Sequence, residues 1–161
     1  MPQKIYSLNV GVSHADTAHY GNTLVPLPCC IADAEFMFKL GELLNYDGRT
    51  LLLNKEATVA NFKENVLKHK DLLEPGDLLI ITYSGHGSKI RDLGFEEVTG
   101  MDQTWCLYDR QLIDDELPRL WVQFPKGVNI LVILDSCHSG TAIKRGGLEP
   151  EDPTLAWLND Y

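Results

Sequence analysis

Two uninterrupted apolar runs, each followed at once by a short polar motif, constrain the fold of this chain most. Residues 78–83 (LLIITY) lead into SGHGS, and residues 129–134 (NILVIL) lead into DSCHSG. A strand that is apolar throughout is typical of a parallel sheet with helices over both faces. The runs therefore predict two buried, neighbouring strands, with both motifs at the carboxyl edge of one sheet, where ligands bind in such folds.

The segments around these runs predict alternating strands and helices in one domain. Further strands are expected at residues 4–12 and 50–53, and helices at 30–44, from Thr58 to about Lys70, and from a cap at Asp114 and Asp115 to about Gln123. A loop is expected over 13–28, and an excursion or small hairpin over 89–103. This order indicates an α/β fold over residues 1–161, with 144–161 as a flexible linker or tail.

Composition and charge limit the classes of function. The 161 residues carry a formal net charge of −9, and 44% of them are hydrophobic. An acidic surface repels phosphates, so nucleic-acid binding is not expected, whereas a cationic substrate would suit it. No apolar run approaches the roughly 20 residues that cross a bilayer, and the N-terminal residues MPQKIYSLNV lack the apolar stretch of a signal peptide. We expect no membrane association and a cytoplasmic location.

The cysteines do not predict a disulfide or a structural zinc site. They are Cys29, Cys30, Cys106 and Cys137. Adjacent cysteines pair poorly, a cytoplasmic setting keeps thiols reduced, and no Cys-x-x-Cys spacing is present.

Cys137 and His86 are the strongest candidates for a catalytic pair. A thiol becomes a strong nucleophile only as the thiolate, so Cys137 needs a base within hydrogen-bond reach. Its neighbour His138 would point the other way on leaving a strand, whereas His86 comes from the end of the other buried strand. The flanking Gly85 and Gly87 let the backbone approach a ligand closely. The N–H groups of Gly87 and Cys137 would then form an oxyanion hole.

Other interpretations of these residues remain open. A cysteine at a strand end is often only a packed apolar side chain. Ser136 and Ser139 are alternative nucleophiles, but neither lies in a Gly-x-Ser-x-Gly elbow, and a serine hydrolase would need a third, acidic residue. A module without catalytic activity, which binds partners through this fold, is the main alternative to an enzyme.

The residues YSGHG at 83–87 and DSCHSG at 135–140 resemble the catalytic large subunit of the caspase-like cysteine peptidases. The resemblance covers residues 4 to 143 and is strongest to the metacaspase and orthocaspase branch. The spacing between His86 and Cys137 matches the one described for caspases. It implies a caspase–hemoglobinase three-layer sandwich with a mostly parallel central sheet. It also implies peptide-bond hydrolysis through a thioester, with Cys137 as nucleophile and His86 as general acid and base.

The same resemblance implies a preference for Arg or Lys at the cleaved position. Cys30, Asp33, Ser84 and Asp135 match the acidic pocket of that branch. Two carboxylates at one sheet edge would pair well with a guanidinium. The alternative is that Asp33 is an exposed helix residue and Asp135 a turn residue.

Calcium is a further implication of the resemblance. Asp102, Asp114 and Asp115 match the aspartates of calcium-dependent relatives, and carboxylates suit a hard cation. However, Lys144 stands where those relatives have another aspartate. Asp114 and Asp115 also have a second interpretation, as a helix cap with an acidic first turn.

The chain is shorter than a complete caspase-like unit, in which a small subunit adds strands and completes the substrate cleft. We therefore expect a small-subunit segment or chain as a partner. Lys144 and Arg145 follow the catalytic motif and would suit self-cleavage by an Arg/Lys-specific peptidase. A processed large subunit, a separate small-subunit chain and an abbreviated stand-alone domain all fit the sequence.

Overall fold

The computed structural model describes residues 3–91 and 101–136. Their centre is a four-stranded sheet in the order β2-β1-β3-β7. Its strands are β1 (Ile5–Gly11), β2 (Gly48–Leu53), β3 (Leu78–Ser84) and β7 (Asn129–Asp135). All neighbours are parallel, and β3 pairs directly with β7. The predicted parallel sheet, with its two apolar runs as neighbouring strands, is therefore confirmed.

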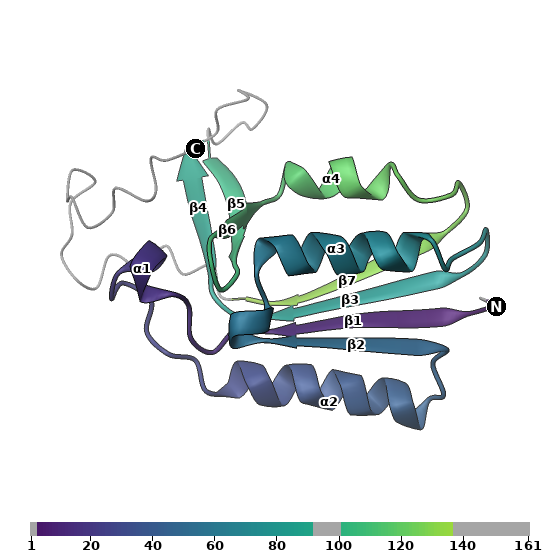
Figure 1. Ribbon diagram of the computed structural model, residues 1–161, viewed down its shortest axis with the longest axis horizontal. Helices are drawn as coiled ribbons and strands as arrows, with labels where there is room; N and C mark the ends of the chain where they lie inside the picture. The colour runs from purple at the N-terminus through teal and green to yellow at the C-terminus, as the bar shows by residue number, and fades with distance from the viewer. Residues whose placement is uncertain (1–2, 92–100, 137–161) are drawn as a thin grey trace.

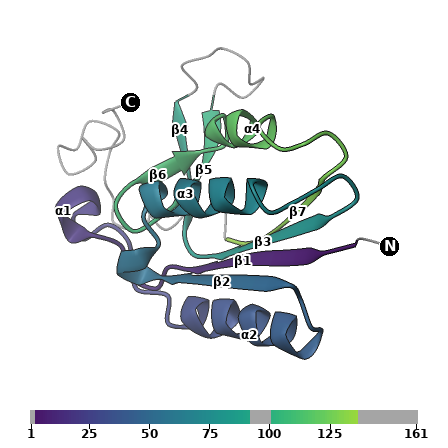
Figure 2. The same cartoon turned by 45° about the vertical axis from the view of Figure 1, so that its right-hand side comes forward.

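Helices cover both faces of this sheet and give three layers (Figures 1 and 2). Helix α2 (Cys29–Leu43) lies on one face and packs against β1, β2 and β3. Helices α3 (Val59–Lys70) and α4 (Glu116–Trp121) lie on the other face. This is the three-layer α/β arrangement that the sequence predicts.

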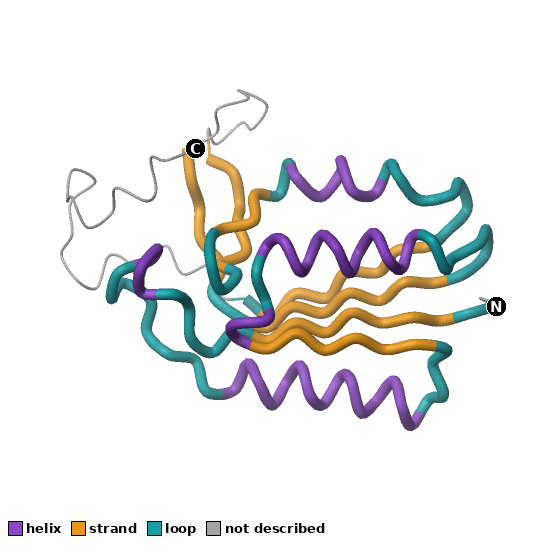
Figure 3. Tube along the Cα trace, viewed as in Figure 1, coloured by secondary structure: helices purple, strands orange, loops and turns teal. Residues whose placement is uncertain are grey.

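A second, smaller sheet rises from the carboxyl end of the first (Figure 3). It is antiparallel, in the order β4-β5-β6, and consists of β4 (Gly87–Arg91), β5 (Met101–Cys106) and β6 (Gln111–Ile113). The β4–β5 pair confirms the predicted hairpin. Strand β6 was not predicted, because three residues are too few to show an alternating pattern.

Two short helical segments lie between the strands and the main helices. Helix α1 (Thr17–Tyr20) lies inside the predicted loop 13–28, and the 3-10 helix η1 (Asn54–Glu56) follows β2. The Asp16 carboxylate caps α1 by accepting a hydrogen bond from the Ala18 N–H at 2.9 Å. The prediction of an unbroken loop was wrong here, because a one-turn helix needs only a cap and leaves no periodic signal.

The helix caps were predicted with mixed success. Thr58 accepts a hydrogen bond from the Asn61 N–H at 3.1 Å and caps α3, as expected. Asp115 occupies the N-cap position of α4, but its side chain makes no capping hydrogen bond. The predicted capping by Asp115 is wrong, because the third helical residue is Pro118, which has no N–H, and the Leu117 N–H bonds the Asp114 carbonyl at 3.0 Å.

Strand β7 is less buried than its apolar sequence predicts. It forms one end of the sheet, and helix α2 packs on the other three strands. As a result Leu131, Ile133 and Leu134 are 46%, 42% and 49% exposed. The prediction that β7 is buried on both faces was therefore wrong for the described part of the chain.

The two faces of the sheet differ in chemistry. The face under α3 and α4 is apolar and includes Leu8, Ile81 and Tyr83. The face under α2 carries buried polar side chains: Thr82 donates to Asn9 Oδ1 at 3.1 Å, and Asn9 donates to Ser7 Oγ at 3.0 Å. Because side chains alternate along a strand, β3 directs Tyr83 to the apolar core and Thr82 and Ser84 toward α2.

The amino ends of three strands are tied to one buried residue, Asp77. Its carboxylate accepts the Lys4 N–H and the Glu74 N–H, both at 2.9 Å, and its carbonyl accepts the Asn129 N–H at 2.9 Å. These bonds align the starts of β1, β3 and β7.

Within the described ranges, every helix is too short or too polar to cross a bilayer.

An ion-pair network joins α3, β6 and α4. The Glu116 carboxylate accepts hydrogen bonds from both terminal nitrogens of Arg110, at 3.0 and 3.2 Å, and forms an ion pair with Lys63. Burial alone would raise the pKa of Glu116. The hydrogen bonds from Arg110, Lys63 and the Ile113 N–H outweigh burial and lower the pKa to about 2. Because the pKa of Glu116 is lower in the folded than in the unfolded protein, its carboxylate stabilises the fold at pH values above the unfolded pKa. This stabilisation is lost as the pH falls toward the folded pKa.

We expect Glu116→Gln to lower the free energy of unfolding at pH 7 by about 2–3 kcal/mol, because the charged hydrogen bonds are lost. The wild-type protein should lose this contribution as the pH falls from 4.5 toward about 2, whereas the variant lacks it throughout. Urea unfolding at a series of pH values measures both effects. Glu64→Gln is the matched control, because its ion pair with Lys68 is 61% exposed at both ends and should contribute less than about 1 kcal/mol. Equal losses in the two variants would contradict the prediction.

Candidate active site

The candidate site lies at the carboxyl edge of the central sheet. Gly11 of β1 is in register with Ser84 of β3, and Ser84 is in register with Asp135 of β7. Two residues after Ser84, the chain reaches His86, and β4 starts directly after it. His86 therefore sits where the two sheets meet, and the Gly85 N–H just before it bonds the Asp135 carbonyl of the central sheet at 3.3 Å.

The His86 ring is held by a backbone carbonyl. It is 8% exposed, and its Nε2 lies 2.6 Å from the carbonyl oxygen of Val25. A carbonyl only accepts hydrogen bonds, so Nε2 carries a hydrogen, and the neutral ring then has its free electron pair on Nδ1. This tautomer leaves Nδ1 able to accept a proton.

Val25 is a residue that sequence reasoning missed. It belongs to the segment between α1 and α2, and its side chain is exposed. The contact is made by the main chain, which every residue type provides, so no residue pattern could have identified it.

The glycine before His86 has a steric explanation. A Cβ added at Gly85 would lie 2.5 Å from the Tyr83 hydroxyl. The close approach that Gly85 allows in this structure is thus an approach to Tyr83, whereas the sequence suggested an approach to a ligand. Gly87 is the first residue of β4 and is paired with Trp105.

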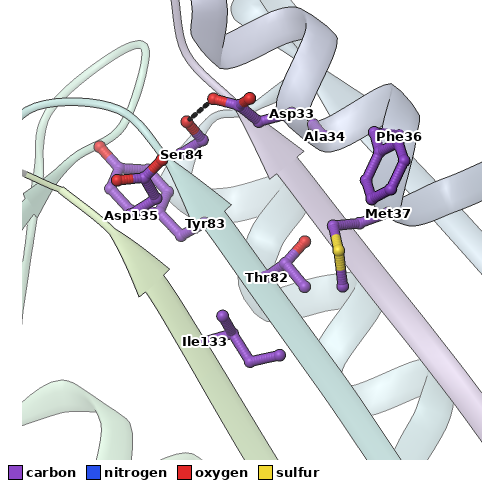
Figure 4. A pocket seen from close by; sticks show the side chains of 9 residues that line it. All are labelled: Asp33, Ala34, Phe36, Met37, Thr82, Tyr83, Ser84, Ile133 and Asp135. Atoms are coloured by element: carbon purple, nitrogen blue, oxygen red, sulfur yellow. Dashed lines mark hydrogen bonds between the residues drawn. The ribbon is translucent and has the colours of Figure 1, made fainter. Parts of the chain in front are cut away.

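A pocket of about 210 Å³ opens between α2 and the ends of β3 and β7 (Figure 4). Its lining comprises Asp33, Ala34, Phe36, Met37, Thr82, Tyr83, Ser84, Ile133 and Asp135. The Ser84 hydroxyl donates to Asp33 Oδ2 at 2.9 Å. Asp33 and Asp135 come from opposite walls of the pocket, with Ser84 between them on β3 (Figure 4).

Cys30 lies close to the same carboxylates. It is 5% exposed, and burial is the main cause that raises the pKa of its thiol. The negative charges of Asp33 and Asp135 raise this pKa further, while a hydrogen bond with Ser84 opposes the rise. The structure thus brings together the four residues proposed for the substrate pocket, Cys30, Asp33, Ser84 and Asp135.

The candidate metal ligands are only partly described. Asp114 accepts the Gln103 N–H at 3.3 Å and the Asp115 N–H at 3.1 Å, so its carboxylate already holds the turn before α4. The backbone of Asp102 pairs with Ile90, and its side chain lies outside the described part. Among the side chains that the structure describes, no group of three or more His, Cys, Asp or Glu residues is placed to hold a metal ion.

Several predicted site residues lie outside the described ranges. They are Cys137, which is the candidate nucleophile, and Lys144 and Arg145, which are the candidate cleavage positions. The last described residue, Ser136, follows β7 directly and is half-buried.

Comparison with known proteins covers most of the chain. Residues 7–145 match the family model for the metacaspase, peptidase C14 domain. Metacaspase-2 of Arabidopsis thaliana is 34% identical over 148 residues, which are 83% of this chain and 34% of that protein. Metacaspase-1 of Candida glabrata is 32% identical over 128 residues, which are 71% of this chain and 33% of that protein. This chain thus spans about a third of the length of these relatives.

A solved structure shares the fold. The crystal structure of protein GSU0716 from Geobacter sulfurreducens has a TM-score of 0.77 and 40% sequence identity to this chain. The likeness covers 89% of this chain and 54% of the other.

The electrostatics of the pocket lead to a prediction for Cys30. We expect Asp33→Asn to increase the rate at which iodoacetamide alkylates Cys30 at pH 8, because removing a nearby negative charge lowers the thiol pKa. Mass spectrometry of the Cys30 peptide measures the rate. Glu35→Gln removes a charge from the same helix that does not act on Cys30, and should leave the rate unchanged. Cys106 is an internal reference, since burial raises its pKa to about 12. An unchanged Cys30 rate in Asp33→Asn would show that the carboxylate does not act on the thiol.

Proposed function

The chain belongs to the metacaspase family, peptidase C14, and on that premise we propose that it is the catalytic part of a cysteine endopeptidase that cleaves after Arg or Lys. The family indicates a cysteine-type peptidase. The observation that carries the proposed specificity is the pocket in which Asp33 and Asp135 lie around Ser84, at the sheet edge that also carries His86.

We assign the proton transfers to His86. With Nε2–H bonded to Val25, Nδ1 takes the proton of the Cys137 thiol, and the thiolate attacks the carbonyl carbon of the scissile peptide. The tetrahedral intermediate collapses when Nδ1–H gives its proton to the leaving nitrogen, which releases an amine and leaves a thioester on Cys137. Nδ1 then takes a proton from water as the water oxygen attacks the thioester. The second tetrahedral intermediate breaks its C–S bond, which releases the acid product, and Nδ1–H returns its proton to the Cys137 sulfur.

The group that holds the histidine of this pair is the neutral carbonyl of Val25. In serine proteases a buried carboxylate holds the histidine and stabilises the imidazolium that forms. A carbonyl fixes the ring and the tautomer but adds no negative charge. The reaction proposed here suits this arrangement, because a thiol is more acidic than a serine hydroxyl and needs less assistance to ionise.

Gly87 and Cys137 are proposed to supply the oxyanion hole through their N–H groups. Gly87 follows His86 directly, at the start of β4. Backbone donors fixed before the reaction begins stabilise the charge that develops on the carbonyl oxygen.

The acidic pocket supports recognition of a guanidinium or ammonium group. Asp33 and Asp135 supply two carboxylates, and the Ser84 hydroxyl orients the first of them. Beyond them, Met37 and Ile133 offer apolar walls for the methylene groups of an Arg or Lys side chain. An aspartate at the cleaved position would meet like charge in this pocket.

The edge of the sheet supports a partner that completes the fold. Strand β7 is the last strand of the sheet in the described ranges, and three of its apolar side chains are 42–49% exposed. We propose that a small-subunit segment or chain covers this edge, as an unpaired strand with apolar side chains favours addition of further structure.

Self-cleavage and calcium are secondary proposals. Lys144 and Arg145 have the side chains that the pocket would accept, so cleavage after either is proposed as self-processing. We also propose that Asp102, Asp114 and Asp115 bind calcium through their carboxylate oxygens. No step of the hydrolysis is assigned to it.

Peptidase assays test the main proposal. Fluorogenic peptides with Arg or Lys at the cleaved position should be hydrolysed, and peptides with Asp should not. Cys137→Ala should abolish the activity. Asp33→Asn and Asp135→Asn should each lower kcat/KM for Arg peptides by roughly 10- to 100-fold, the range for loss of a hydrogen bond to a charged group.

Controls separate this proposal from its alternatives. Glu35→Gln should leave kcat/KM unchanged, because Glu35 does not line the pocket. Mass spectrometry of the incubated protein should show cleavage after Lys144 or Arg145 in the wild type and not in Cys137→Ala. Preferential hydrolysis of Asp peptides would refute the pocket assignment. No hydrolysis of any peptide, with Cys137 no more reactive than Cys106, would favour a binding module.

The calcium site is tested by thermal unfolding. If the three aspartates hold calcium, a saturable rise in Tm is expected, since a ligand that binds only the folded state stabilises it. EGTA should reverse the rise, and Asp115→Asn should reduce it, because the Asp115 side chain has no capping role in the fold. No response to calcium would leave Asp114 with its structural role alone.

A further inference from the structure

The Tyr83 hydroxyl touches the main chain of His86. Tyr83 is 1% exposed, and its hydroxyl oxygen lies 2.7 Å from the His86 carbonyl oxygen and 2.9 Å from the Cys106 carbonyl oxygen. The Cys106 N–H also donates to the His86 carbonyl, at 2.9 Å. The one hydroxyl hydrogen is shared between the two carbonyls, and the His86 carbonyl accepts it together with the N–H from β5.

The ring that carries this hydroxyl is fixed by the core. Tyr83 stacks on Trp105, with ring centroids 5.2 Å apart and an interplanar angle of 15°. Trp105 meets Phe62 of α3 edge to face, with centroids 5.7 Å apart. Aromatic contacts of this kind restrict the ring, so the hydroxyl has a defined position relative to both sheets.

The chain after β3 passes closely over the hydroxyl. Glycine is required at position 85 because a Cβ there would lie 2.5 Å from the hydroxyl oxygen and 2.7 Å from the ring carbon that bears it. The turn that presents His86 is thus built against the Tyr83 side chain.

We propose that Tyr83 is a positioning residue, whose hydroxyl holds the His86 main chain so that the imidazole keeps the orientation in which Val25 binds its Nε2. The inference rests on the proposed function. His86 is held at two points: Val25 fixes its ring through Nε2, and Tyr83 fixes its backbone. The Cys106 N–H also holds the His86 carbonyl, so loss of the Tyr83 hydroxyl should loosen the main chain at His86 without releasing it.

Substrate binding and positioning can be separated here. Tyr83 borders the pocket, but its side chain points to the opposite face of the sheet, among Trp105 and Phe62. Loss of the hydroxyl should therefore act on the chemical step and leave the contacts of the substrate side chain intact.

Tyr83→Phe is the decisive variant, because it keeps the ring and removes only the hydroxyl. We expect kcat for an Arg peptide to fall roughly tenfold, as misplaced catalytic groups lose rate without losing affinity, while KM changes less than about twofold. Rates are normalised to titrated Cys137, so that only folded molecules are counted. NMR of the ¹⁵N-labelled His86 ring should show the Nε2–H tautomer in the wild type and a mixture of tautomers in the variant.

Thr104→Val is the matched control. Thr104 also has a buried hydroxyl in this region, which donates to Gln111 Oε1 at 2.7 Å, and its hydrogen bond with Cys106 involves the thiol and not the main chain that Tyr83 meets. It should lower Tm by an amount similar to Tyr83→Phe and leave kcat and the His86 signals unchanged. Unchanged kcat and unchanged His86 signals in Tyr83→Phe would overturn the proposal, and so would an equal fall of kcat in both variants.

Failure of the proposed function gives a different result. In that case the wild-type protein shows no hydrolysis that depends on Cys137. The His86 signals still test the positioning role, since they report the tautomer without any substrate.

Discussion

The in-register parallel pairing of β3 with β7 is the constraint on which the candidate site depends. It sets Ser84 beside Asp135, so that the polar residues after two apolar strands meet at one edge. Asp77 aligns the other ends of these strands by bonding to the main chain of Lys4 and Asn129. A shift of one residue in β7 would turn Asp135 to the opposite face and remove one wall of the pocket.

Sequence reasoning identified most of this framework because its signals are local and strong. The run LLIITY is long, apolar and followed at once by the polar motif SGHGS, and both α2 and α3 show helical spacing. The structure places Asp33 near Ser84 and Asp135, although 51 residues separate Asp33 from Ser84, because α2 begins at the edge of the sheet where β3 and β7 end. The proximity of these residues thus follows from the parallel fold and not from their spacing in the sequence.

The features that sequence reasoning missed depend on tertiary context. An apolar strand reads the same whether one or both faces are covered, so the exposed side of β7 could not be distinguished from a buried one. Asp115 has a good capping side chain, yet Pro118 offers it no N–H and the Leu117 N–H already bonds the Asp114 carbonyl. Gly85 was predicted to make room for a ligand, whereas it makes room for the Tyr83 ring. The position of that ring depends on Trp105, which lies in a different sheet and could not be placed from the sequence.

The bond between His86 and the Val25 carbonyl has a consequence for how such sites change over time. A carboxylate partner is lost by a single substitution, whereas any residue at position 25 would still present a carbonyl. Alanine scanning would therefore overlook this partner, and the residue at this position is free to vary in identity as long as the main-chain path is kept. Exchange of the segment 13–28, by insertion or deletion, would disturb the histidine where point mutation would not. Selection at position 25 thus acts on the path of the main chain and leaves the side chain there largely unconstrained.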